Sequence, residues 1–258
     1  MHPSSSAYGG LIHDYHHHHD LMLEYDEMPF RCYGCLEAGF GHRYTCVEQC
    51  GHVLHMDCAN PKAILAHPFF PDCVFHFLVS SEKDCRCDAC GAGIDGYVYH
   101  CFDKGKNLHP CCANLKHRLP VETEEGTMTL VLRHKSSSKC YKCGKKHLIK
   151  GANSWMYVSE SEEHHFHVSC VKNNMLEILD DFILGGKGAA PNLESNEIRA
   201  LDKGLHKLSV ARRKDSGKKG KFAKLKKIVK IAIAVVMAAV FGDPTALVAA
   251  VIANLVMH

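Results

Sequence analysis

Cysteine and histidine recur in this chain at spacings that suit metal binding. Three Cys-x-x-Cys pairs stand 55 and 53 residues apart, and each is followed 19 to 24 residues later by an apolar residue and a His-x-x-Cys sequence. A Cys-x-x-Cys turn can direct both sulfurs at one ion, and the later His and Cys complete a tetrahedral Cys₃His set. Such a set leaves no position open for water, which indicates a structural rather than a catalytic metal.

We therefore predict one closed zinc site in each of three repeats. The predicted ligands are Cys32, Cys35, His55 and Cys58 in the first repeat, Cys87, Cys90, His109 and Cys112 in the second, and Cys140, Cys143, His167 and Cys170 in the third. An aromatic, strand-like segment lies between the two halves of each set, at 40–44, 96–99 and 155–158. Three copies in register favour metal binding over isolated redox pairs.

Further Cys and His residues predict a second, interleaved site in the first repeat. Its expected ligands are Cys46, Cys50, His19 and His67, although the neighbours His16, His17 and His18 compete with His19. The second repeat carries Cys73 and Cys101 as candidate ligands of an equivalent second site. The choice among Cys85, Cys111, His76 and His117 as their partners stays open. The third repeat carries Ser159 where Cys46 and Cys101 stand. We expect three to five zinc ions, with four as the central value.

The composition also favours metal over disulfides. The chain holds 15 Cys and 21 His in 258 residues. Small modules that bury little apolar surface need additional stabilisation by bound metal ions or disulfides. The first residues lack the basic and apolar regions of a secretory signal. We therefore expect an intracellular, cytoplasmic protein whose thiols stay reduced. An odd number of cysteines is also incompatible with complete disulfide pairing.

Positive charge is concentrated at the C-terminal end. Residues 201–258 hold twelve Lys and Arg against three Asp, a net charge of +9, so the rest of the chain carries −6 within the total of +3. The basic run 212–230 is followed by apolar residues 231–241 and 246–257, which flank Gly242-Asp243-Pro244. This pattern predicts a helical tail that either meets an anionic membrane surface or packs on the protein. Because no base-reading module accompanies the lysines, nucleic-acid binding is not expected.

Several motifs resemble the divergent C1 (Cys/His-rich) domain family of plants. They are His19-Asp-Leu21-Met-Leu23, Phe30-Arg-Cys32-x-x-Cys35, Leu54-His55-x-x-Cys58-Ala59, Gly96-Tyr-Val-Tyr-His-Cys101, Leu108-His-Pro-Cys-Cys-Ala113 and Gly242-Asp-Pro-Thr-Ala-Leu247. The resemblance implies zinc binding and a role in plant signalling, stress or endomembrane pathways. Some family annotation suggests disulfide reductase activity. Diacylglycerol binding is not expected, because the gap from Cys35 to Cys46 holds only ten residues and leaves little loop for a lipid groove.

The expected fold is a tandem array of small, zinc-stapled, β-rich modules of C1-like α+β type. We place the modules at 13–66, 67–120 and 127–184, a basic linker at 185–220 and the basic, then apolar, tail at 221–258. Short helical turns are expected after each closing Cys, at 59–66 and 171–184. The predicted function is that of a non-catalytic interaction scaffold with protein partners. The alternative is a thiol–disulfide oxidoreductase that uses the Cys-x-x-Cys pairs.

Overall fold

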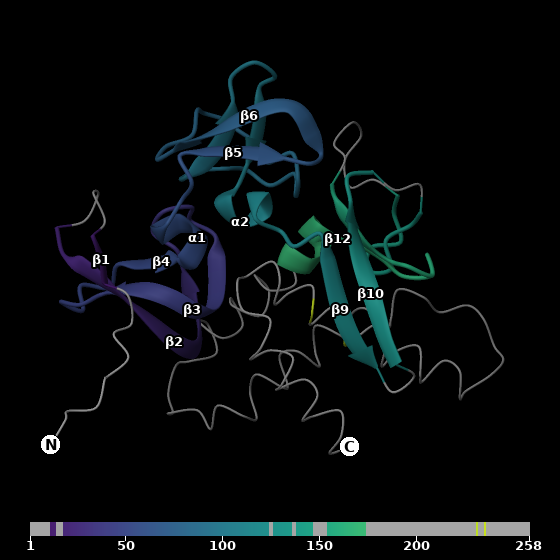
Figure 1. Cartoon of the computed structure of the whole chain (residues 1–258), viewed down its shortest axis with the longest axis horizontal. Helices are drawn as coiled ribbons and strands as arrows, with labels where there is room; N and C mark the ends of the chain where they lie inside the picture. The colour runs from purple at the N-terminus through teal and green to yellow at the C-terminus, as the bar shows by residue number, and fades with distance from the viewer. Residues whose placement is uncertain are drawn as a thin grey trace, which may run out of the picture.

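The structure is a computed structural model that describes residues 11–13, 18–123, 126–135, 138–146 and 154–173, together with Ile231 and Val235. Three four-stranded antiparallel sheets follow one another along the chain, and Figure 1 shows them as separate blocks coloured from purple to green. The expectation of a β-rich chain with few helices is confirmed for the described residues. The predicted linker and most of the tail lie outside them.

Each sheet is built from strands that are also neighbours in sequence. The first contains β1 (Leu11–His13), β2 (Asp20–Arg31), β3 (Ala38–Cys46) and β4 (Val53–His55), and the second contains β5 (Ile64–His67), β6 (Phe70–Leu78), β7 (Val98–Cys101) and β8 (Lys106–Leu108). The third contains β9 (Arg118–Thr123), β10 (Gly126–Arg133), β11 (Met156–Ser159) and β12 (His165–His167). Strand β5 begins at Ile64 and strand β9 at Arg118. Both lie ahead of residues 67 and 127, at which the second and third modules are predicted to begin.

The Cys-x-x-Cys pairs occupy the same place in all three sheets, between the second and third strands. We call these turns the first (32–36), second (87–91) and third (140–144) knuckles. In each, the fifth residue donates its backbone N–H to the carbonyl of the first Cys, at 2.7 to 3.0 Å. That fifth residue is Leu36, Gly91 or Gly144, and its φ is positive, at 59°, 75° and 68°. Glycine adopts this backbone conformation without the steric cost that a side chain adds.

The predicted helical turns are placed too late in the sequence. Helix α1 (Met56–Ala59) starts directly after His55 and contains Cys58, and α2 (Pro110–Ala113) repeats this arrangement after His109. A single helical turn is needed within His-x-x-Cys itself, because residues three apart face the same side of a helix. The prediction of a helix at 59–66 is therefore wrong, since Ile64–His67 forms β5 and pairs with β6. In the third module residues 168–173 are helical, and residues from 174 to 184 lie outside the described part.

Consecutive modules meet through a repeated set of contacts. The carbonyl of the third knuckle residue accepts a hydrogen bond from the first aromatic residue of the next module's central segment: Gly34 O from Tyr97 N at 2.9 Å, and Ala89 O from Trp155 N at 2.8 Å. Two residues further on, a tyrosine hydroxyl donates to the carbonyl that lies four residues after the preceding closing Cys. These pairs are Tyr99 with Lys62 (3.0 Å) and Tyr157 with Lys116 (2.7 Å).

This repetition shows that the modules follow one another head to tail with the same geometry. The largest hydrophobic cluster spans the second and third modules and also includes Ala38 from the first module and Ile231 and Val235 from the tail. The first module has its own cluster, which Tyr97 of the second module joins. The described parts of the three modules therefore share buried surface.

The contact between the first two modules yields a sharp prediction at Gly96. A Cβ on Gly96 would lie 2.1 Å from the backbone oxygen of Gly34, whereas a Cβ on Gly93, in the same loop, meets nothing within 4 Å. We expect Gly96→Ala to lower the free energy of unfolding by about 2 kcal/mol, the usual cost of overpacking. Gly93→Ala is the matched control and should be nearly neutral. Chemical denaturation of both variants measures the difference, and equal stabilities would contradict the close approach.

Candidate metal centres

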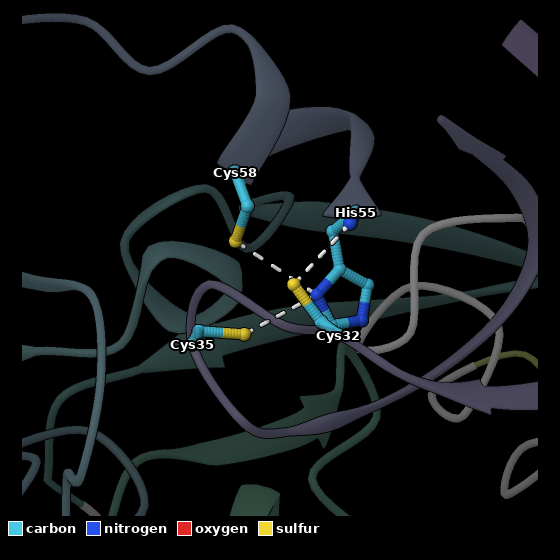
Figure 2. A group of neighbouring side chains, drawn as sticks. All are labelled: Cys32, Cys35, His55 and Cys58. Carbon is cyan, nitrogen blue, oxygen red and sulfur yellow. Dashed lines mark hydrogen bonds between the residues drawn. The ribbon is translucent and has the colours of Figure 1, made fainter. Parts of the chain in front are cut away.

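The first candidate metal centre gathers Cys32, Cys35, His55 and Cys58, whose ligand atoms all lie within 4.8 Å of one another. Figure 2 shows the three sulfurs and the imidazole converging on one point. The knuckle supplies Cys32 and Cys35, the end of β4 supplies His55, and α1 supplies Cys58. All four residues are buried. Folding of the first sheet thus brings residues more than twenty positions apart in sequence into one closed set.

The second and third centres repeat this arrangement. Cys87, Cys90, His109 and Cys112 form the second set and are all buried, and Cys140, Cys143, His167 and Cys170 form the third, in which Cys143 is partly exposed. The structure thus brings together all twelve residues that the spacing assigned to closed sites. It places the ligands of each centre in one module and shares none between modules.

The distances within each set fit a tetrahedral ion. In each set the Sγ atoms of the second knuckle Cys and of the closing Cys lie 3.3 to 3.9 Å from the His Nδ1 atom. A tetrahedron with Zn–S bonds of about 2.3 Å and Zn–N bonds of about 2.0 Å has S···N edges of roughly 3.6 Å. The side chains therefore already have the separation that a bound ion requires. Nδ1 is the atom that would bind it.

The other imidazole nitrogen is occupied by the backbone in all three centres. Nε2 lies 3.0 Å from the Ala38 carbonyl in the first centre, 3.0 Å from Gly93 in the second and 3.1 Å from Lys146 in the third. An N–H on Nε2 donates to these oxygens and leaves the lone pair on Nδ1, so the required tautomer is favoured. Contacts of this kind orient metal-binding histidines and strengthen the bond to the ion.

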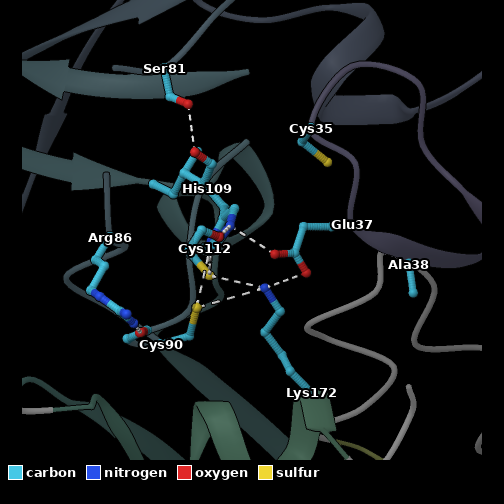
Figure 3. Close-up of polar contacts among 12 residues, drawn as sticks. Cys35, Glu37, Ala38, Ser81, Arg86, Cys90, His109, Cys112 and Lys172 are labelled. Atoms are coloured by element: carbon cyan, nitrogen blue, oxygen red, sulfur yellow. Dashed lines mark hydrogen bonds and ion pairs between the residues drawn. The ribbon is translucent and has the colours of Figure 1, made fainter. Parts of the chain in front are cut away.

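The second centre is also contacted by charged residues from both neighbouring modules. Glu37, from the first module, lies 2.7 Å from His109 Nε2 through one carboxylate oxygen and 2.7 Å from Lys172 Nζ through the other. Lys172, from the third module, lies 3.8 Å from the sulfur of Cys90 and 4.0 Å from that of Cys112. Figure 3 shows this network, in which the Lys172 ammonium lies between the Glu37 carboxylate and the sulfurs of Cys90 and Cys112. The second centre is therefore the place where all three modules meet.

Charge balance explains why the lysine lies there. Three thiolates that held a divalent ion would carry a net charge of −1, and the Glu37 carboxylate adds another negative charge. Lys172, with only 4% of its side chain exposed, supplies the positive charge that both need. Burial alone would raise the Glu37 pKa, but the hydrogen bond with His109 and the Lys172 charge lower it to about 2. Glu37 is thus ionised at neutral pH.

A fourth group consists of His19, Cys46 and Cys50, and the sulfur of Cys46 lies 3.4 Å from His19 Nδ1. Contrary to the prediction, the structure does not bring His67 to this group. His67 ends β5, whose pairing with β6 carries it into the second module, where its ring lies 4.7 Å from that of Trp155. Burial is the main reason why its pKa is lowered to about 4, and the nearby charges of His134 and His117 lower it further. His67 is therefore a neutral residue of the core between modules.

The remaining cysteines of the second module do not complete a further site among the described residues. Burial is the main reason why the pKa of Cys73 is raised to about 11, and a hydrogen bond with Cys101 raises it further. No group of three or more ligand atoms in the described part of the chain includes either residue, nor Cys85, Cys111, His76 or His117. The described residues thus hold three closed sets and one partial set. The prediction of four zinc ions stays a prediction.

The sequence did not reveal the roles of Glu37 and Lys172. Each lies two residues after a ligand, Cys35 and Cys170, in a stretch where charged side chains are ordinary surface features. The only signal in the sequence is that each residue lies two positions after a predicted ligand. That signal does not say which module each would contact, because the modules had to be placed in space first.

No helix in the described part of the chain is long and apolar enough to cross a membrane. No protein-family model, curated protein or solved structure matches this chain.

Proposed function

We propose that the chain is a non-catalytic scaffold whose three modules are stapled by zinc and held in one order for binding other proteins. The observation that carries this proposal is the repetition of a closed, tetrahedral Cys₃His set in three modules joined by identical contacts. Thiolate and imidazole ligands in a tetrahedron suit zinc, which has no redox chemistry and serves as a structural ion in such sets. When bound, it supplies folding free energy to modules with small cores.

The motif resemblance supports the same role. C1-like zinc modules in tandem, in a plant protein of signalling, stress or endomembrane pathways, are what the sequence motifs imply, and three β-rich modules with Cys/His clusters are compatible with that expectation. The proposal for the tail concerns Ile231 and Val235, which are helical, four residues apart and buried in the largest hydrophobic cluster. The burial of these two residues favours packing of this part of the tail on the protein over insertion into a membrane. We therefore propose protein partners ahead of an anionic membrane surface.

The competing function, disulfide reduction, needs a thiolate that a substrate disulfide can reach. Five of the six knuckle cysteines are buried, and all six belong to closed four-ligand sets. The zinc-loaded protein is therefore expected to show no turnover of a disulfide substrate such as insulin in the presence of a thiol reductant. The matched control is the chelator-treated protein, in which any activity belongs to metal-free thiols. Turnover that depends on Cys32/Cys35, Cys87/Cys90 or Cys140/Cys143 with zinc still bound would favour the oxidoreductase instead.

A further inference from the structure

The repeated contacts between modules cover the first two knuckles and not the third. In the first knuckle Gly34 lies against the loop that holds Gly96 and Tyr97, and in the second Ala89 lies against Trp155. The following module thus lies against the knuckle that precedes it. Cys35 and Cys90, the last ligands of these knuckles, are accordingly only 2% and 3% exposed.

The third knuckle is the last of the series. Lys142, in the place of Gly34 and Ala89, is partly exposed, and so is Cys143, in the place of Cys35 and Cys90. The next residues, Gly144, Lys145 and Lys146, are exposed. The difference follows from the order of the modules, because the ligand set, the knuckle turn and the His contact are the same in all three. Within the described residues no fourth module follows to cover this knuckle.

From this asymmetry we propose that Cys143 is a site of thiol modification by peroxide-class oxidants, and that the third centre loses its metal before the other two. The sulfurs of Cys143 and Cys170 both lie within the 4.8 Å cluster. Two metal-bound thiolates give up two electrons and form one S–S bond, while hydrogen peroxide takes up the two electrons and two protons and becomes two water molecules. A metal ion held by this set would lose two of its four ligands, so the remaining two would no longer retain it. The chain would thus combine two protected structural centres with one that responds to oxidation.

The full-length, zinc-loaded protein provides the test. It is treated with increasing hydrogen peroxide while a chromogenic chelator reports the zinc released, and in parallel with N-ethylmaleimide, followed by peptide mass spectrometry. Among the three closed sets, we expect the third to release its zinc first, with a new disulfide that includes Cys143. We also expect maleimide addition at Cys143 to be about tenfold or more faster than at Cys35 and Cys90, whose modification requires local opening. Cys85, which is partly exposed and belongs to no group of ligands among the described residues, serves as the reference for an accessible thiol outside the metal centres.

Two variants connect the reactivity with its proposed cause. Cys143→His replaces the reactive sulfur by another zinc ligand and should slow zinc release by peroxide while retaining the metal. Gly96→Ala pushes the second module away from the first knuckle and should raise the labelling of Cys35 towards that of Cys143, whereas Gly93→Ala should leave it unchanged. If either variant fails to fold, the order of labelling in the wild-type protein decides alone. Equal labelling of Cys35, Cys90 and Cys143, or simultaneous loss of all three ions, would overturn the proposal.

Discussion

Cys112→Ser is expected to release one metal ion per chain and to unfold the second module. Cys112 is fully buried in the second centre, and a serine in its place leaves three ligands and a hydroxyl that binds zinc poorly. In small zinc modules the free energy of metal binding is largely folding free energy, on the order of 10 kcal/mol per site. That exceeds what a module of this size gains from its apolar core. Metal analysis and the loss of cooperative thermal unfolding would measure the effect.

The matched control for this variant is Cys85→Ser. Cys85 lies in the same module, is partly exposed and belongs to no closed set, so the same substitution there should leave the metal content and the unfolding transition almost unchanged. The wild-type protein should carry at least three zinc ions. A folded protein that contains fewer than about two ions per chain would contradict the assignment of structural metal centres.

The ligand sets could be predicted from the sequence because they obey local rules. A Cys-x-x-Cys turn fixes the relative positions of two ligands, and a His-x-x-Cys helical turn fixes those of the other two. The strand register of one sheet is then enough to bring the two pairs of ligands together. The same reasoning failed for His67, because its assignment depended on where the first module ends. The chain enters β5 at Ile64, and the pairing of β5 with β6 then places His67 beside Trp155.

The contacts between modules could not be predicted from the sequence, for a related reason. The bonds of Gly34 with Tyr97 and of Ala89 with Trp155 join residues more than sixty positions apart, with no periodic pattern that marks them as partners. They form a repeat only with respect to the place of each knuckle in its sheet. The position of Lys172 depends on these contacts, since the third module must dock on the second knuckle before the lysine can reach Glu37.

Lys172→Met should therefore destabilise the arrangement of all three modules. The substitution leaves the Glu37 carboxylate, only 13% exposed, buried beside a centre of negative charge. Removing one partner of a buried ion pair costs about 3 to 5 kcal/mol, because the remaining charge is uncompensated. Lys106→Met is the matched control. Its partner Asp88 belongs to a pair whose side chains are 40% and 25% exposed, and such a surface pair contributes at most about 1 kcal/mol.

The double variant with Glu37→Gln separates the ion pair from simple loss of packing. Glu37→Gln alone should cost less than Lys172→Met, because Lys172 retains the sulfurs of Cys90 and Cys112 as negative partners. Combining the two changes removes both buried charges, so the double variant should be more stable than the sum of the single effects predicts. Chemical denaturation of the zinc-loaded proteins, with metal content checked in each, measures the coupling. Additive effects, or a Lys172→Met variant as stable as Lys106→Met, would mean that the charge of Lys172 does not hold the modules together at the second centre.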